Sequence, residues 1–348
     1  MKFGLFYQMQ WPEHKTQEQV FAELTEEVQF AEKLGFHSVW IAEHHFTRYG
    51  IAPSPLQLAT YLAAKTSTIR LGTSISVLPF HNPVLLAEEV AMLDVLSGGR
   101  VDFGVGRGLA GGAEYLSMNV ASEESEGRFA EMLDVLPGLW TTPDFCHEGR
   151  YYRVKNVTVL PRPVQKPYPP VYVGVTRTES RIREAVDHGW QVVTGVTISY
   201  DDHLEIRRKY RLLAAQQGKD VEPSQSPFFY HTYVAETAQE AREGPRDGLM
   251  WMYRMMDFRR SSTHGRELSG GFLDWVRDHP EPSISLQHVS EKQAFFGTPS
   301  EVADRIRELR DVHNVQYYGC DFSFGGNDHG KIMRTMELFA AKVMPQLA

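Results

Sequence analysis

The sequence predicts an α/β fold, namely a (β/α)8 TIM barrel with insertions. About eight short apolar runs of strand character alternate with amphipathic stretches at helical spacing. The length of 348 residues is normal for one such barrel with insertions. The alternative is a doubly wound open sheet, which would usually carry Gly-x-Gly-x-x-Gly after its first strand; the run from Phe6 to Gln10 lacks this pattern. We therefore expect one barrel domain over residues 1–348.

The expected strands are short and rich in β-branched and aromatic residues. In chain order they are Phe3–Gln8, Val39–Ala42, Ile69–Leu78, Val101–Val105, Val171–Val175, Gln191–Val196, Phe228–Ala235 and Tyr317–Phe322. The expected helices have one apolar face; the first aligns Val20, Leu24 and Val28 and stops at Gly35. These helices are Gln17–Leu34, Pro55–Lys65, Pro83–Leu96, Ser122–Leu139, Glu179–His188, Tyr200–Gln217, one from Ala238, Ser300–His313 and Gly330–Met344.

Two segments interrupt the alternation. Proline, aromatic and charged residues dominate Pro143–Pro170, which is typical of an inserted surface hairpin. The segment Asp257–Lys292 is polar and rich in Gly, Ser and Pro. For this second segment we expect a long loop that acts as a mobile lid rather than a core element.

The composition excludes several classes of protein. A net charge of -8 argues against nucleic acid or an anionic membrane as a partner. No apolar run is long enough to cross a bilayer, and the first residues lack the form of a signal peptide. Only Cys146 and Cys320 are present, so a secreted disulfide scaffold is excluded and a reducing cytoplasm is the expected location.

An acid and two histidines, Glu43, His44 and His45, directly follow the second expected strand. If that strand belongs to a barrel, its carboxyl end is where the chemistry lies. Adjacent histidines on an extended chain point to opposite sides, and no other His, Asp or Glu cluster has metal-ligand spacing, so we predict no metal. A neutral imidazole suits proton transfer, and at most one of the two rings should face the pocket.

Two further segments indicate a phosphate site. Glycines surround Arg107 in Gly104–Gly112, after the fourth expected strand, and together they offer backbone N–H groups and a forked cation. The helix that opens within Thr176–Arg181 has hydroxyls and a cation, which fit either an ordinary N-cap or an anion site. The two segments together suggest two sides of one phosphate pocket. Arg128 could contribute to that pocket or be a surface charge.

Small residues from Gly72 to Ser76 end the third expected strand, where bulk would be expected. They fit either tight packing inside the barrel or a flat ring lying against the backbone. The Gly-x-Ser-x-Gly motif is absent, so a serine hydrolase has no support.

These motifs together resemble the bacterial luciferase-like flavin monooxygenases, most closely the luciferase alpha subunit. The resemblance covers nearly the whole chain, and its specificity comes from the order and spacing of many weak motifs. Those motifs are Met1-Lys2-Phe3-Gly4, Gly35-Phe36 through Val39-Trp40, Glu43-His44-His45-Phe46-Thr47, Gly72-Thr73 to Val77-Leu78-Pro79, Pro83-Val84, Leu93-Asp94 with Gly99-Arg100, Arg107-Gly108-Leu109, Pro170-Val171-Tyr172-Val173, Gly297-Thr298-Pro299 and Val343-Met344-Pro345.

The resemblance implies a role for each candidate residue. His44 would be the catalytic base, and Glu43 and His45 would contact the substrate or support the residues that do, with His45 as a supporting residue. Ser74 and Ile75 would form a non-proline cis peptide against the flavin ring. Gly106 takes the place of a reactive cysteine of luciferase, so light emission is not implied. The implied cofactor-binding residues are Ser74, Ile75, Gly106, Arg107, Leu109, Arg128, Thr176, Arg177, Thr178 and Ser180.

The resemblance also implies an activity and its partners. Reduced FMN, supplied by a separate NAD(P)H:flavin reductase, would react with O2 to a C4a-peroxyflavin that oxygenates a hydrophobic aldehyde, ketone or similar small molecule. A homodimer, or a heterodimer with a related subunit, would form through the helices Pro55–Lys65 and Pro83–Leu96. Two alternatives stay open: a deazaflavin-dependent hydride-transfer oxidoreductase, and a flavin-binding protein without turnover.

Overall fold

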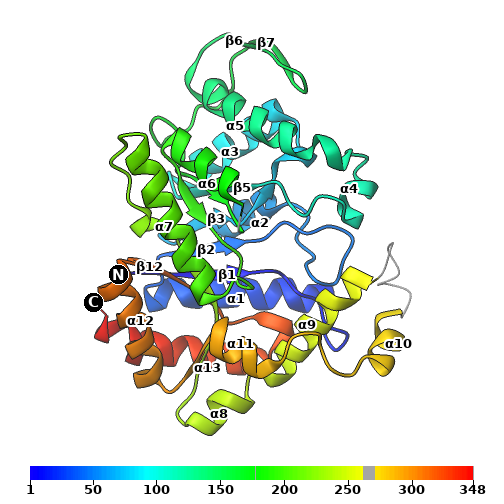
Figure 1. Ribbon diagram of the computed structural model, residues 1–348, viewed down its shortest axis with the longest axis vertical. Coiled ribbons are helices and arrows are strands. Elements are labelled where there is room, and N and C mark those ends of the chain that lie inside the picture. Colours follow the sequence, from blue (N-terminus) through cyan, green and yellow to red (C-terminus); the bar gives the residue numbers. More distant parts are fainter. Residues whose placement is uncertain (177, 262–270, 348) are drawn as a thin grey trace.

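A parallel sheet curls into a barrel at the centre of the molecule, with helices around it (Figure 1). The computed structural model describes residues 1–176, 178–261 and 271–347. The barrel strands are β1 (Lys2–Tyr7), β2 (Ser38–Ile41), β3 (Arg70–Thr73), β4 (Ser76–Val77), β5 (Val101–Gly106), β8 (Val171–Gly174), β9 (Gln191–Val193), β10 (Phe228–Val234), β11 (Ala294–Gly297) and β12 (Tyr317–Asp321). Their order is β11-β10-β12-β1-β2-β3-β5-β8-β9, with β4 paired to β5. The predicted TIM-barrel class is confirmed.

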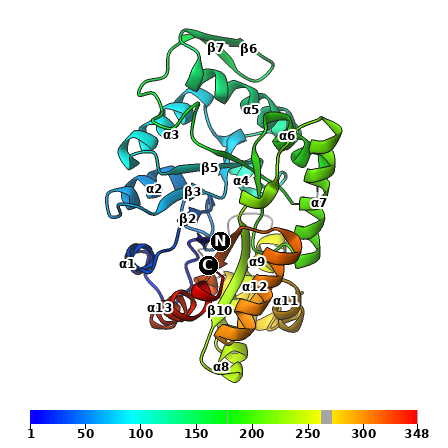
Figure 2. The ribbon, with the colours of Figure 1, turned by 90° about the vertical axis from the view of Figure 1, so that its left-hand side faces the viewer.

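Helices follow the strands and cover the outside of the sheet (Figures 1 and 2). They are α1 (Gln17–Leu34), α2 (Pro55–Ala63), α3 (Pro83–Ser97), α4 (Ala113–Ser117), α5 (Ser125–Thr141), α6 (Glu179–His188), α7 (Tyr200–Gln216), α8 (Ala238–Glu243), α9 (Arg246–Ser261), α10 (Gly271–Asp278), α11 (Leu286–Lys292), α12 (Pro299–His313) and α13 (His329–Leu338). Local sequence sets their ends: α1 begins with a capping box between Thr16 and Gln19 and stops at Gly35. Among the helices of these described ranges, none combines the length and apolar composition needed to span a membrane.

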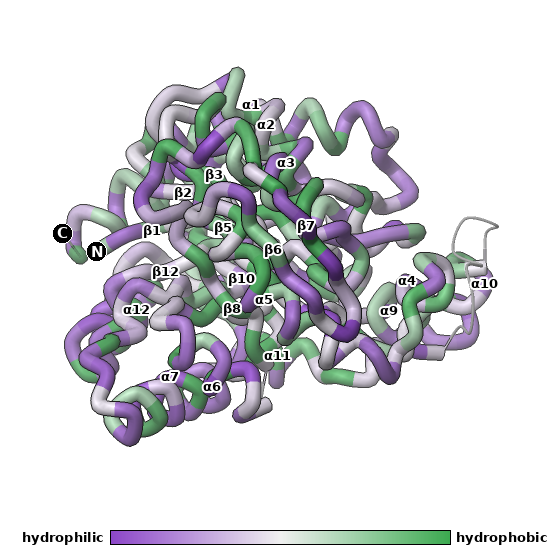
Figure 3. Tube along the Cα trace, turned by 90° about the horizontal axis from the view of Figure 1, so that it is seen from above, coloured by the Kyte–Doolittle hydropathy of each residue, from purple (hydrophilic) through white to green (hydrophobic). Residues whose placement is uncertain are grey.

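Alternate residues of each strand point to opposite faces and so divide the core into two parts. One face fills the barrel interior with aromatic side chains, among them Phe6, Trp40, Phe229 and Tyr317. The other face packs against the surrounding helices in a larger apolar cluster. Figure 3 shows hydrophobic residues concentrated in the central strands, as this arrangement requires.

An antiparallel hairpin lies within the segment Pro143–Pro170, for which an inserted hairpin was predicted. Strands β6 (Phe145–Glu148) and β7 (Arg153–Val157) pair antiparallel with an irregular register after Phe145. The hairpin projects beyond the barrel helices in Figures 1 and 2.

The third predicted strand is divided in two. Residues Ile69–Leu78 were expected to be continuous, but β3 ends at Thr73 and β4 begins at Ser76. Between them the Ser74–Ile75 peptide bond is cis, which interrupts the ladder at the carboxyl end of the sheet. This observation agrees with the cis bond that the family resemblance implies.

The prediction of an irregular loop over Asp257–Lys292 is wrong for the described part of that segment. The end of α9, all of α10 and all of α11 are helical there, while residues 262–270 lie outside the described ranges. Phe272 and Val289 are buried in an apolar cluster that we call the α9–α11 cluster. Polar residues and prolines around these few apolar positions hid the helical spacing. The short strand β11 that follows was also missed.

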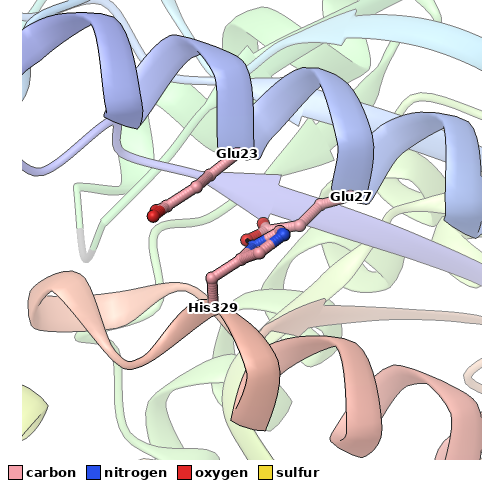
Figure 4. Close-up of side chains that lie close together, drawn as sticks. All are labelled: Glu23, Glu27 and His329. Carbon is pink, nitrogen blue, oxygen red and sulfur yellow. Dashed lines mark hydrogen bonds and ion pairs between the residues drawn. The ribbon is translucent and has the colours of Figure 1, made fainter.

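An ion-pair group joins α1 to α13 on the outside of the barrel (Figure 4). Both ring nitrogens of His329 face carboxylates, Nδ1 at 2.9 Å from Glu27 Oε1 and Nε2 at 3.1 Å from Glu26 Oε2. The hydrogen bond with buried Glu27 is the main reason that the pKa of His329 is raised to about 9. On the same helix Glu23 pairs with Lys15 at 2.7 Å. The positive charge of the His329 imidazole therefore balances the negative charge of the buried Glu27 carboxylate.

Replacing His329 by Gln should lower the free energy of unfolding at neutral pH but not in strong base. The folded pKa is about 9 against an ordinary 6.5, so the stabilisation is complete below about pH 6.5 and disappears as the pH rises through 9. Urea unfolding of both proteins at about pH 6, 8 and 10 checks this. The exposed His14→Gln change is the control, and a difference that persists unchanged in base would contradict the assignment.

Candidate functional site

Glu43, His44 and His45 leave the carboxyl end of β2, and the two imidazoles diverge. His45 is buried and its Nε2 lies 3.0 Å from Glu43 Oε1. The His44 side chain keeps 21% of its surface exposed and packs edge-on against the Tyr49 ring, with centroids 5.0 Å apart. The structure therefore divides the pair, with His44 on the open side and His45 on the packed side.

The Glu43 carboxylate is buried and has several hydrogen-bond partners. His81 Nε2 lies 3.1 Å from Oε2 and 3.2 Å from Oε1, and the Val77 N–H donates to Oε2 at 3.0 Å. Burial alone would raise the pKa of Glu43, but the bonds with His45 and His81 lower it. The same contact raises the pKa of His81 against the opposing effect of burial. Glu43 is thus an ionised carboxylate that holds His45 and His81 next to His44 in the chain fold.

A carboxylate on the open side of His44, and an arginine that pairs with this carboxylate, were not identified from the sequence. Glu114 Oε1, on α4, lies 3.5 Å from His44 Nδ1, and Arg259, on α9, lies 3.5 Å from the same oxygen. Burial opposes ionisation of Glu114, but His44 and Arg259 bring its pKa down to about 2. Burial lowers the pKa of His44; Glu114 opposes this shift and Arg259 adds to it. The ring is therefore neutral at physiological pH beside a fixed carboxylate.

Close approach of the backbone at Gly50 makes room for the His44 ring. A Cβ at Gly50 would lie 2.7 Å from His44 Cδ2 and 2.5 Å from the Gln8 carbonyl oxygen. Only glycine fits against the imidazole here, so the loop after β2 sets the orientation of His44.

The Ser74–Ile75 segment forms an apolar platform across neighbouring strand ends. A Cβ at Gly106 would lie 2.5 Å from Ile75 Cδ1, and one at Gly174 would lie 2.9 Å from its Cγ2. The Ile75 side chain therefore spans the ends of β5 and β8 and stays partly exposed. The small residues Gly106 and Gly174 thus allow tight packing against Ile75, as one of the two interpretations predicted. The rest of the Ile75 side chain is partly exposed, which leaves an apolar surface against which a flat ring could lie.

Arginines gather at the start of α5. Arg107 Nη1 lies 3.4 Å from Glu126, and the buried Arg181 pairs with the same carboxylate. Arg128 pairs with Glu124 at 2.7 Å. The structure thus brings the loop after β5 and the start of α6 to one carboxylate, so the two segments lie close together, while the phosphate pocket stays a prediction. Arg181 has no distinguishing spacing, and only its tertiary contact with Glu126 indicates a role.

The start of α6 offers exposed hydroxyls. Thr178 is the N-cap residue of α6, but its side chain makes no capping hydrogen bond. Thr176 and Ser180 are exposed beside it, and Leu109 is 73% exposed in the loop after β5. Arg177, also predicted to bind the cofactor, lies outside the described residues. Thr178 therefore occupies the N-cap position without the side-chain hydrogen bond of an ordinary N-cap.

The sequence showed no second metal-spaced cluster, but the described residues contain one such group, away from His44. Glu23, Glu27 and His329 place one ligand atom each within 4.8 Å of one another (Figure 4). Lys15 already pairs with Glu23, and His329 pairs with Glu27. The group is accounted for as the ion-pair connection between α1 and α13.

Comparison with curated proteins identifies relatives over the whole chain. The oxygenase component of the flavin-dependent trigonelline monooxygenase of Acinetobacter baylyi is 31% identical over 326 residues, which cover 91% of this chain and 88% of that protein. The alkanal monooxygenase alpha chain of Photorhabdus luminescens is 28% identical over 356 residues, covering 100% of this chain and 97% of that protein.

Solved structures share the fold. The monooxygenase RslO1 of Streptomyces bottropensis superimposes with a TM-score of 0.84 at 29% identity and full coverage of both chains. The oxygenating constituent of 3,6-diketocamphane monooxygenase of Pseudomonas putida, solved with FMN, has a TM-score of 0.79 at 19% identity and covers 99% of this chain and 98% of its own. A sequence profile described as "Luciferase-like monooxygenase" matches residues 1–313, and the chain therefore belongs to the luciferase-like monooxygenase family.

Proposed function

We propose that this protein is the oxygenase of a two-component monooxygenase that uses reduced FMN and O2. The observation that carries the proposal is the neutral His44 imidazole, held beside Glu114 at the carboxyl end of the barrel. The apolar Ile75 platform, Arg107 in the loop after β5 and Arg128 on α5 lie at the same end of the sheet. The apolar platform suits the uncharged ring of a flavin, and the arginines suit its negatively charged phosphate.

The residues present fit FMN. Ile75, above Gly106 and Gly174, offers a flat apolar surface for the ring. Arg107 and Arg128 offer cations for the phosphate, and the uncommitted Thr178 hydroxyl adds a donor. Both arginines now hold carboxylates, so a phosphate would have to displace Glu126 and Glu124. The FMN held by the diketocamphane monooxygenase is in keeping with this assignment.

FMN, when bound and reduced, would supply the electrons that activate O2, and Ile75, Arg107 and Arg128 are the residues that would hold it. The chain's own contribution is a proton acceptor and a dry site. His44 is neutral because burial opposes its protonation, so Nε2 or Nδ1 can accept a proton. Helices α9, α10 and α11 pack an apolar cluster against Tyr49, the neighbour of His44, and this cluster would keep water away from the bound flavin. The substrate class that fits is a hydrophobic aldehyde, ketone or related small molecule.

The protein would work with two partners. A separate NAD(P)H:flavin reductase would supply the reduced flavin, since the trigonelline monooxygenase relative is named as an oxygenase component. A second copy, or a related subunit, would cover the apolar surface of α2 and α3. There Tyr61, Leu85, Met92 and Leu96 are 47%, 59%, 47% and 60% exposed, which is unusual for neighbouring large apolar side chains.

The experiment that tests the function supplies reduced FMN and O2 with panels of aldehydes and ketones and measures product and H2O2. Oxygen consumption with product formation is expected. A deazaflavin-dependent hydride transfer would instead proceed without O2, and a binding protein would give no product with any substrate.

Replacing His44 by Ala should slow product formation by about 10²–10⁴-fold while FMN still binds, because the proton acceptor is lost and the phosphate contacts remain. Product is measured by gas chromatography and FMN binding by fluorescence quenching. His14→Ala is the matched control, since that residue is exposed before α1. A fully active His44→Ala protein would refute the assignment.

Replacing Arg107 by Ala should weaken FMN binding by roughly 10- to 100-fold, the value of a charged hydrogen bond to phosphate. Titration of FMN fluorescence measures the dissociation constant. Arg183→Ala on α6 is the control, because that guanidinium pairs only with the exposed Glu179 in the described structure. An unchanged isotherm removes Arg107 from the phosphate site.

Replacing both Leu85 and Leu96 by Asp should shift the protein from dimer to monomer, since two charges would be buried in the proposed interface. Sedimentation velocity reports the oligomeric state. Leu212→Asp, at a residue 48% exposed on α7, is the control. A wild-type protein that sediments as a monomer would refute the proposed interface on α2 and α3.

A further inference from the structure

The two nitrogens of the His44 ring lie in different surroundings. Nδ1 is buried and lies 3.5 Å from Glu114 Oε1, and no described residue forms a shorter polar contact with it. At another edge of the ring the Gly50 backbone approaches closely, since a Cβ there would lie 2.7 Å from Cδ2. The exposed 21% of the side chain therefore lies toward Cε1 and Nε2. Nε2 is thus the ring nitrogen that faces the open side.

The oxygen that faces Nδ1 is a hydrogen-bond acceptor. The backbone N–H of His45 donates to Glu114 Oε1 at 3.1 Å, and the Arg259 guanidinium lies 3.5 Å from the same atom. Neither a backbone amide nor a guanidinium can accept a hydrogen bond, so Glu114 Oε1 carries no hydrogen. A lone pair on His44 Nδ1 would be repelled by this oxygen. In the neutral ring the hydrogen is therefore on Nδ1, and the free lone pair is on Nε2.

Arg259 contacts both groups that hold the His44 ring. Besides its contact with Glu114, its guanidinium lies over the Tyr49 ring, 4.8 Å from the centroid. Tyr49 in turn packs edge-on against His44, and its hydroxyl accepts a hydrogen bond from Gln8 Nε2 at 2.8 Å. The imidazole is thus held between a carboxylate and an aromatic ring that one cation from α9 ties together.

We propose that Glu114 is a positioning residue for His44, which fixes Nε2 as the atom that accepts the proton, and that Arg259 holds Glu114 in place. In the transfer the Nε2 lone pair takes the proton, the reacting molecule keeps the electron pair, and the Nδ1 hydrogen stays on the ring. Glu114 then balances the charge of the imidazolium. The 3.5 Å contact is long, but such contacts commonly tighten when the reacting molecule binds. The inference rests on the proposed function and deepens it, since either nitrogen could act there.

The charges around His44 predict shifts of opposite sign. Glu114 on α4 and Glu43 at the end of β2 raise the pKa of His44, whereas burial and Arg259 on α9 lower it. Removing the charge of Glu114 should therefore lower that pKa, and removing the charge of Arg259 should raise it. General damage to the site does not produce two opposite shifts.

The first test needs no variant. Protein labelled with ¹³C-histidine is studied by NMR without flavin in mildly alkaline buffer, because the chemical shift of the ring carbon Cδ2 differs between the two neutral tautomers. The His44 signal is identified among the 14 histidines as the one missing from His44→Gln. We expect the tautomer with hydrogen on Nδ1. A His44 ring with its hydrogen on Nε2 overturns the proposal.

Two variants then test the charges by NMR titration. Glu114→Gln keeps the shape but should lower the His44 pKa by about one, the effect of a unit charge at this distance even in water. At the pH where His44 is half protonated in the wild type, about a tenth should be protonated in the variant. The exposed Glu123→Gln is the control. Unchanged protonation in Glu114→Gln overturns the proposal.

Arg259→Met should shift the same titration the other way, toward a higher pKa. Arg254→Met is the matched control, because Arg254 lies on the same helix and its Nε donates to the Met250 carbonyl of that helix. A lower pKa of His44 in Arg259→Met overturns the role given to Arg259.

Turnover separates this inference from the proposed function. Glu114→Gln should lower kcat at least about tenfold, with KM and the FMN dissociation constant nearly unchanged, because only the proton acceptor is affected. An unchanged kcat overturns the positioning role. The NMR measurements need neither flavin nor substrate. A protein with the expected tautomer and shifts but no product refutes only the monooxygenase proposal, and one that forms product with the hydrogen on Nε2 refutes only the role of Glu114.

Discussion

The Glu43 carboxylate is the interaction on which the rest of the site depends. A buried charge is costly unless it is paired and hydrogen-bonded, so the chain around Glu43 must supply partners. It does so with two imidazoles and the Val77 N–H, which come from the end of β2, from β4 and from the turn that follows it. Because His45 is committed to Glu43, His44 is the imidazole left on the open side. A single buried charge thus ties together two strand ends and orients the candidate base.

A second layer of charge connects that base to the helices that cover the barrel. Glu114 contacts His44 from α4, and Arg259 contacts Glu114 from α9. The covering helices and the proposed base therefore share one electrostatic group. Any movement of α9 that displaced Arg259 would raise the pKa of Glu114 and change the surroundings of His44. Under the proposed function, the covering helices would therefore influence the protonation of His44 as well as shield the site.

Most of the fold could be predicted because helix ends and turns depend on residues that are neighbours in the sequence. Helix ends such as Thr16 and Gly35 and the inserted hairpin depend on neighbours in sequence, and they were located to within a few residues. The segment Asp257–Lys292 was misjudged because its helices carry few apolar residues among many polar ones. Its burial comes from contacts with distant strands and helices. The short strand β11 was missed for the same reason, since pairing with β10 defines it.

The sequence by itself determined the barrel, the divergence of His44 from His45 and the family, because strand periodicity and motif order are properties of neighbouring residues. Only the tertiary structure decided which charges meet. Glu114 contacts His44 and also accepts from the backbone N–H of His45, 69 positions earlier in the chain, and His231 meets Asp321 at a separation of 90 positions. No spacing rule encodes such pairs, since they arise when parallel strands bring their carboxyl ends to one edge. The fold was predictable from local patterns, whereas the electrostatics of the site required the curled sheet.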